Sequence, residues 1–267
     1  MRALRRTIFR RLVRGLARLT PRAPRVAFTV CDVLAPLVFA PLSRKRLQEI
    51  FQLNDAVASR VIKLARRAQM RNFMLAESIR LYDYPALYSS YALNERVHTL
   101  PRPAIIGTFH LGALPAVGAG LEILPARALV VRSTPKLANH HPNLEIVITR
   151  GGDQQRARVF TQAVQFLQSG QYVFLPLDPE ESTRVTAPFR GRTMQLARGP
   201  FALSRITGAP IIPMIARWNG MRIEYVIGDA IASGDEATTA AAAASWLEGH
   251  LEKYPEDISP RVLELTT

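Results

Sequence analysis

One histidine in this chain stands where a parallel β-sheet would expose a catalytic base. His110 follows the apolar run AIIGTF, residues 104–109, and Pro115 lies five positions after it. An imidazole changes charge near neutral pH and can take a proton from an attacking hydroxyl, which contributes roughly 10²–10⁴ in rate. Such a base usually works beside a carboxylate that orients the ring. Pro115 supplies neither a charge nor an N–H, so the acid must come from elsewhere if this is an active site.

Two acidic residues further along the chain could supply that carboxylate. Asp178 and Glu180 stand in LDPEES, directly after the apolar run YVFLP. Catalytic groups of α/β folds gather where strands end and loops begin, so a base after one strand and an acid after another can face one crevice. The alternative is that His110 is a core histidine whose ring is satisfied by a backbone carbonyl.

The elements that would position these groups begin after about residue 100, where short β-rich runs alternate with helical segments. We expect strands in 102–110, around 127–133, and in 144–149, 172–178 and 221–231. Helices are expected in 156–170 and 235–253, and a helix, a glycine turn and a strand in 197–217. This alternation predicts an α/β fold whose mixed, mainly parallel sheet is flanked by helices. From 44 to about 92, apolar spacing predicts two consecutive amphipathic helices with a break near 83–85.

Composition and charge narrow the classes of partner. The chain has 267 residues, 48 % of them hydrophobic, and a formal net charge of +14, which favours an anionic partner. Nine arginines lie in residues 1–25, and the first acidic residue is Asp32. The one cysteine, Cys31, excludes an intramolecular disulfide; it lies in an apolar stretch, and we expect it to pack rather than react.

The first 43 residues are predicted to form a helical, membrane-associating region. Leu4, Ile8, Leu12 and Leu16 recur every four positions among the arginines, which predicts a basic amphipathic helix of the kind that lies on a membrane surface. The alternative is an ordinary surface helix on a globular core. Residues 26–42 are apolar but contain an aspartate and two prolines, and are shorter than the ~20 residues of a transmembrane helix. We therefore expect an interfacial or shallowly inserted hairpin, held at the cytoplasmic face by the basic residues around it.

Five segments in the same order resemble the bacterial lipid A late acyltransferases and mannoside acyltransferases, relatives of the glycerolipid and lysophospholipid acyltransferases. They are RNFMLAESIRLYDYP, similar to the family's helical region; GTFHLGALP, similar to its histidine motif; ALVVRS, similar to its next strand; RVFTQAVQFLQSGQYVFLPLDPE, similar to the stretch leading to its aspartate motif; and APFRGRTMQLARGPFALSRITGAPIIPMIAR, with its Phe-x-Gly loop and Thr-Gly-Ala-Pro turn. The likeness covers nearly the whole chain. It departs at Pro115, where the family carries an acid, and in EKYPEDISPRVLELTT, which lacks the family's tryptophan- and arginine-rich close.

The resemblance implies roles for further residues. Arg132 and Arg190 would bind substrate phosphates, and Gly191 and Gly199 would let backbone N–H groups approach an anion at a helix start. The alternatives are solvated surface arginines and ordinary turn glycines. The apolar stretch after His110, residues 113–124, could line an acyl groove or serve close helix packing.

The function implied is that of a membrane-associated acyltransferase. It would move an acyl chain from an acyl-carrier-protein or coenzyme A thioester to a hydroxyl or amine of a lipid or other amphiphile, with His110 as base and Asp178 or Glu180 as the acid. The domains expected are 1–43 and 44–267, peripheral or monotopic on the cytoplasmic face of the bacterial inner membrane and bound to anionic lipid. No cofactor, metal or nucleic acid is expected, because residues for a zinc site or a nucleotide loop are not found and the arginines follow an amphipathic helix. The alternative is a catalytically inactive member that binds lipid or acyl groups.

Overall fold

The computed structural model describes residues 2–82, 90–92, 95–122, 124, 126–132, 143–149, 152–178 and 183–267. The N-terminal part consists of α1 (Arg2–Leu19), α2 (Pro24–Val38), α3 (Arg44–Phe51), α4 (Asp55–Leu81) and the 3₁₀ helix η1 (Glu95–Thr99). The chain then alternates through β1 (Ala104–Thr108), α6 (Leu114–Glu122), β2 (Ala128–Arg132), β3 (Leu144–Ile148), α7 (Asp153–Gln168) and β4 (Tyr172–Pro176). It continues with β5 (Arg184–Phe189), β6 (Arg192–Ala197), α8 (Arg198–Thr207), β7 (Ile211–Asn219), β8 (Arg222–Ile227), α9 (Glu236–Lys253), η2 (Pro255–Asp257) and α10 (Pro260–Leu265).

A six-stranded sheet in the order β3-β2-β4-β1-β7-β8 forms the centre of the protein, and β5 and β6 pair separately as an antiparallel hairpin. Neighbouring strands of the large sheet are parallel except for β7 and β8. Strands covered by helices on both faces are apolar at nearly every position, as β1 is in AIIGT. The expected α/β fold with a mixed, mainly parallel sheet flanked by helices is confirmed.

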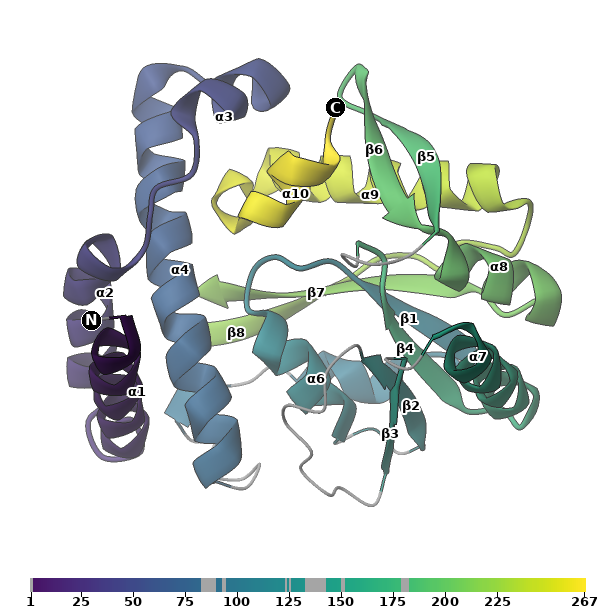
Figure 1. Ribbon diagram of the computed structural model, residues 1–267, viewed down its shortest axis with the longest axis horizontal. Coiled ribbons are helices and arrows are strands. Elements are labelled where there is room, and N and C mark those ends of the chain that lie inside the picture. Colours follow the sequence, from purple (N-terminus) through teal and green to yellow (C-terminus); the bar gives the residue numbers. More distant parts are fainter. Residues whose placement is uncertain are drawn as a thin grey trace.

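Successive side chains of the strands point to opposite faces of the sheet and pack into two hydrophobic cores, one on each face. Ile106 of β1 lies in the core shared with α1, α2, α4 and α6. Ile105, the residue before it, lies in the core shared with α3 and α7 to α10. This follows from the two-residue period of a strand. Figure 1 shows the resulting layers, with the long helix α4 between the helices α1 and α2 and the sheet.

The N-terminal helices differ from the sequence-based expectation in two ways. Residues 24–38 form one helix rather than a hairpin; Pro36 lies in its last turn, so its missing N–H removes a single helical hydrogen bond and only two residues of the helix follow it. The apolar positions of 57–81 lie on a single 27-residue helix, α4, preceded by α3. The expected break at 83–85 lies outside the described residues. The predicted boundary at 43 falls in the linker between α2 and α3, and stays a prediction.

Helix α1 packs on α4 through only a part of its apolar face. Val13, Leu16 and Ala17 are buried, whereas Ile8 and Leu12 are exposed. The helix is amphipathic and basic as expected, but its neighbour selects the face that is buried. Among the described residues, none of the helices combines the length and apolar content needed to cross a bilayer.

Arg46 joins the N-terminal half of the chain to its C-terminal helix. Its Nη2 donates to the carbonyl oxygens of Leu263 and Thr266, at 2.7 Å each, at the end of α10. A guanidinium at this position donates to carbonyl groups that have no hydrogen-bond partner within the helix. Its positive charge also interacts favourably with the negative end of the helix dipole. Arg46 therefore fixes α10 in place, which is important because α10 also contacts the candidate active site.

We expect Arg46→Ala to lower the free energy of unfolding by about 1–2 kcal/mol, the net value of hydrogen bonds to a charged group on a partly exposed side chain. Urea unfolding followed by circular dichroism would measure it. The matched control is Lys45→Ala, because Lys45 is 86 % exposed and pairs only with Glu49 at 3.8 Å among the described residues. Equal stability losses in the two variants would contradict this role of Arg46.

Candidate active site

The pairing of β1 with β4 brings His110 and Asp178 together. The two strands are parallel neighbours, and Thr108 is aligned with Pro176 at their carboxyl ends. His110 and Asp178 each lie two residues beyond these partners, so both emerge at the same edge of the sheet. The ladder extends past the strands, because the Leu177 N–H donates to the Thr108 carbonyl at 2.7 Å.

The contact between the two side chains is a short hydrogen bond. His110 Nδ1 lies 2.8 Å from Asp178 Oδ1, and the backbone N–H of His110 donates to Oδ2 at 2.9 Å and Oδ1 at 3.1 Å. A carboxylate only accepts, so it selects the imidazole tautomer that carries its hydrogen on Nδ1. Asp178 is 1 % exposed and the His110 side chain 41 % exposed. The acid is thus buried behind a ring that solvent or substrate can reach.

Hydrogen bonds from β6 and α10 hold the backbone of the segment that carries Asp178. The Leu177 carbonyl accepts from the N–H of Ala197 at the end of β6, at 2.8 Å. The Asp178 carbonyl accepts from Nε of Arg261 on α10, at 3.1 Å. The sequence did not single out Arg261. Ser259 followed by Pro260 signals the start of a helix, but no residue near Arg261 in the sequence indicates that this helix contacts Asp178.

The loop after His110 is equally constrained. Phe109 is buried and its ring stacks on Trp246 of α9 at 6.5 Å. Gly112 has a φ of +59°, a conformation that glycine adopts readily, and a Cβ there would collide with the carbonyl oxygen of Ala216. Only glycine fits at this point, which explains its place two residues after the histidine.

Pro115 lies in the first turn of α6, where a missing N–H costs no helical hydrogen bond. The carboxylate that contacts the His110 ring is that of Asp178, two residues after β4. The small residues that follow serve close packing, because a Cβ on Gly120 would lie 2.6 Å from the Tyr225 hydroxyl. The structure therefore favours helix packing over an acyl groove for this stretch.

We expect Pro115→Asp to change turnover of an acyl thioester by less than about tenfold, that is, by less than about 1.4 kcal/mol in the barrier. The physical reason is that Nδ1 of His110 is already hydrogen-bonded to Asp178, so a second carboxylate is not needed to orient the ring. Initial rates of the variant and of the natural chain would measure the change. A gain well above tenfold would instead identify position 115 as a degraded catalytic position.

Two of the predicted substrate-binding residues lie at the sheet edge that carries the dyad. Arg132 is the last residue of β2, a parallel neighbour of β4. Gly199 is the second residue of α8, which starts directly after the bond from Ala197 to Leu177. A Cβ on Gly199 would meet nothing within 4 Å. The role of both residues in binding an anion stays a prediction. Glu180 lies outside the described residues.

The structure gives Arg190 and Gly191 other tasks than those predicted. Arg190 bonds Glu252 of α9 at 3.0 Å and its guanidinium lies over the Phe51 ring, so carboxylates of the protein itself occupy it. Gly191 does not begin a helix; with φ values of +51° and +69°, Arg190 and Gly191 form the two-residue turn of the β5–β6 hairpin. The sequence did contain a local indication of this turn, because glycine is common at the second position of a two-residue hairpin turn.

A second histidine–carboxylate pair shows why exposure matters. His250 Nε2 lies 3.0 Å from Asp257 Oδ2, and Arg217 contacts the same oxygen at 3.3 Å. The side chains of His250 and Asp257 are 1 % and 4 % exposed, so no substrate can reach them. Cys31 is also buried, as expected for a packing residue, and burial raises the pKa of its thiol to about 12.

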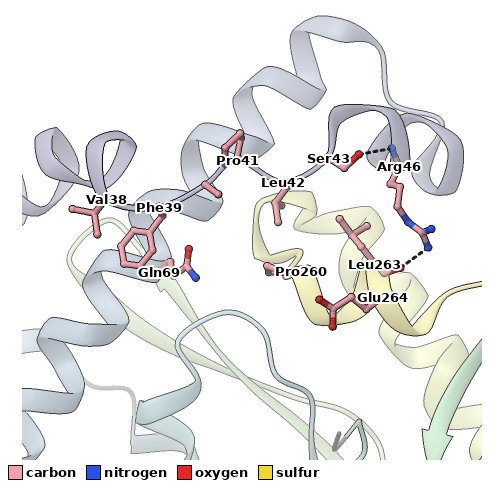
Figure 2. Close-up of a pocket in the computed structure, with 11 residues that line it drawn as sticks. Val38, Phe39, Pro41, Leu42, Ser43, Arg46, Gln69, Pro260, Leu263 and Glu264 are labelled. Carbon is pink, nitrogen blue, oxygen red and sulfur yellow. Dashed lines mark hydrogen bonds between the residues drawn. The ribbon is translucent and has the colours of Figure 1, made fainter. Parts of the chain in front are cut away.

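An apolar pocket of about 540 Å³ lies beside α10, a size in the usual range for small-molecule sites. Figure 2 shows it between the α2–α3 linker, α4 and α10; its lining comprises Val38, Phe39, Ala40, Pro41, Leu42, Ser43, Arg46, Gln69, Pro260, Leu263 and Glu264. The sequence did not predict it, because residues more than 200 positions apart form its walls. Helix α10 thus borders the pocket and, through Arg261, contacts the segment of Asp178.

No protein-family model matches the chain, and none of the curated proteins matches it. Among solved structures, the crystal structure of the 1-acyl-sn-glycerophosphate (LPA) acyltransferase PlsC from Thermotoga maritima is similar, with a TM-score of 0.45 and 12 % sequence identity. The alignment covers 88 % of this chain and 99 % of that one.

Proposed function

We propose that this protein is an acyltransferase that moves an acyl chain from a thioester to a hydroxyl or amine of a lipid or other amphiphile. One observation carries the proposal: the half-exposed His110 imidazole is bonded through Nδ1 to the buried Asp178 at the carboxyl edge of a parallel sheet. That edge is where α/β folds place their reactions. Acyl-carrier-protein and coenzyme A thioesters are the two donors we consider.

The dyad supplies the proton transfers that the reaction needs. With Nδ1 bonded to Asp178, Nε2 is the nitrogen that would take the proton as the acceptor oxygen or nitrogen attacks the thioester carbonyl. Collapse of the tetrahedral intermediate breaks the carbon–sulfur bond, and the imidazolium returns its proton to the departing thiolate. Asp178 stabilises the positive charge on the ring between these two steps.

An amphiphilic acceptor is supported by the pocket beside α10. Its walls are mostly aliphatic or proline side chains, with Arg46 and Glu264 as the charged members. We propose that it receives an apolar part of a substrate. Val38, the last residue of α2, lines the pocket, and two further apolar side chains of the same helix, Val33 and Leu37, are exposed.

We also propose that α1 and α2 lie on the cytoplasmic face of the bacterial inner membrane, as a peripheral or monotopic attachment. Val33 and Leu37 on α2 are 64 % and 79 % exposed, and Ile8 and Leu12 on α1 are exposed as well. Arginines of the same helices that reach solvent are Arg10, Arg11, Arg14, Arg18 and Arg25. Exposed apolar groups beside cations suit an interface with anionic lipid.

We expect the double change Val33→Ser and Leu37→Ser to weaken binding to anionic phospholipid vesicles at least about tenfold, since each apolar side chain withdrawn from water contributes roughly 1.5–3 kcal/mol. Vesicle flotation across a salt series would measure it, and added salt should weaken binding by screening the arginines. The matched control is Ile206→Ser, because Ile206 is 56 % exposed but lies on α8. Equal losses from both surfaces, or binding to nucleic acid in place of vesicles, would contradict the membrane assignment.

The activity itself is tested by incubating the full chain with acyl-coenzyme A or acyl-carrier-protein and vesicles containing hydroxyl- or amine-bearing lipids. Release of free thiol and the mass of the acylated lipid are measured together, so that transfer is separated from hydrolysis. We expect both products to appear in equal amounts. Binding of thioester or lipid without release of thiol would instead support the inactive, lipid-binding alternative, which the loss of the acid at Pro115 first suggested.

A further inference from the structure

A single carboxamide ties helix α4 to the loop that carries His110. Asn72 of α4 donates from Nδ2 to the carbonyl oxygen of Gly112, 2.7 Å away. Its Oδ1 accepts from the indole Nε1–H of Trp218 on β7, at 2.9 Å. Because an indole nitrogen only donates, this second bond determines which way the amide faces. The donor end of Asn72 is therefore directed at the loop.

Asn72 completes the fixation of one peptide group next to the catalytic ring. The N–H of Ala113 donates to the carbonyl of Ala216 at 2.6 Å, and Asn72 holds the carbonyl of Gly112 in the same peptide group. The peptide cannot rotate unless both bonds break. It lies two residues after His110, whose own N–H must point at Asp178.

The helix that presents Asn72 is itself anchored at this point. Arg71, the preceding residue, makes a bidentate pair with Asp32 of α2 at 2.8 and 3.0 Å. It also donates to the Gly220 carbonyl at 2.6 Å, and its guanidinium lies over the rings of Phe28 and Trp218. Movement of Asn72 therefore requires the disruption of several contacts, and its carboxamide is a rigid support for the loop.

We propose that Asn72 is a positioning residue for the His110–Asp178 dyad. The inference rests on the proposed function, in which the ring must meet a substrate with its Nε2 while Asp178 holds Nδ1. The ring is 41 % exposed, so side-chain packing confines it less than a buried ring, and its orientation depends on the loop backbone. A misplacement of about 1 Å in a catalytic group can cost on the order of 10²-fold in rate.

The test compares two changes of a side-chain amide to an acid. Asn72→Asp keeps an acceptor for Trp218 but places a carboxylate oxygen against the Gly112 carbonyl. Gln155→Glu is the matched control, because Gln155 of α7 makes a similar part-buried bond to the Ile148 carbonyl, at 2.9 Å, away from the dyad. Long-range ¹H–¹⁵N spectra of the imidazoles report the tautomer of His110, and the spectrum of His110→Gln identifies its signals. Thioester turnover gives kcat and KM separately.

We expect Asn72→Asp to reduce the Nδ1–H tautomer of His110 and to lower kcat about 10- to 100-fold, with KM changed less than about twofold. Gln155→Glu should leave the tautomer as it is in the natural chain. If Asn72→Asp does not fold, Asn72→Ala removes the same donor and is expected to give the same signature. Unaltered tautomer and kcat in a folded Asn72 variant, or the same change in Gln155→Glu, would overturn the proposal. If the natural chain shows no turnover, the proposed function fails, whereas the spectra still decide the role of Asn72.

Discussion

Replacing His110 by alanine is expected to lower thioester turnover by about 10²–10⁴-fold, the contribution of a positioned general base. The substitution removes the only group in the dyad that can take the proton of the acceptor. Because the change also removes the Nδ1–H donor from the buried Asp178 carboxylate, the free energy of unfolding should fall by about 1–3 kcal/mol. Initial rates at saturating thioester, together with urea unfolding, would measure both quantities.

The control for this prediction is His98→Ala. His98 lies on η1 and is exposed, so the variant removes an imidazole without touching the sheet edge. It should retain the rate of the natural chain within about twofold, since surface substitutions away from a site are usually close to neutral. Equal turnover by His110→Ala and His98→Ala would remove His110 from the mechanism and favour the lipid-binding alternative.

Asp178→Asn is expected to lower turnover by about 10³–10⁴-fold while the fold is kept, as the change from acid to amide does in a Ser-His-Asp triad. The amide oxygen can still accept from the His110 backbone N–H, which occupies one side of the carboxylate in the natural chain. The amide NH₂ is then left to face Nδ1 and donates to it. The imidazole hydrogen moves to Nε2, and the nitrogen that should act as base becomes a donor.

Two measurements separate this effect from a loss of structure. The imidazole ¹⁵N spectrum should show the His110 hydrogen moved from Nδ1 to Nε2, and the unfolding curve should stay close to that of the natural chain. Asp229→Asn, at an exposed position after β8, is the control for removal of a charge. Turnover by Asp178→Asn within tenfold of the natural chain would show that another group orients the ring.

Local patterns were sufficient for most elements of the sheet and for the residues at its edge. AIIGT, ALVVR, LEIVI and YVFLP are short apolar runs bounded by polar or turn residues, and each forms a strand within the predicted limits. The same patterns placed His110 and Asp178 after two of these strands. This part was predictable because the periodicity of a strand and the signals that end it are encoded in neighbouring residues.

The hairpin of β5 and β6 was not predicted, although an ordinary turn was kept as the alternative to an anion site at Gly191. Arg190 pairs with Glu252, a residue 62 positions later that no local pattern connects with it. The sequence did not decide which part of the apolar face of α1 is buried, because Ile8 and Leu12 fit the helical period as well as Val13 and Leu16 do. Which side of such a helix is buried depends on the shape of α4 beside it.

The amino-acid sequence alone determined the strands of the large sheet, the basic N-terminal region and the presence of a histidine without an acid five positions after it. Only the tertiary structure decided which acid faces that histidine. His110 and Asp178 are 68 positions apart, and their contact depends on β1 and β4 being parallel neighbours in a register that aligns Thr108 with Pro176. Backbone hydrogen bonds between strands are the same for any pair of strands, so neighbour and register are fixed by how the two cores pack, which no short stretch of residues encodes.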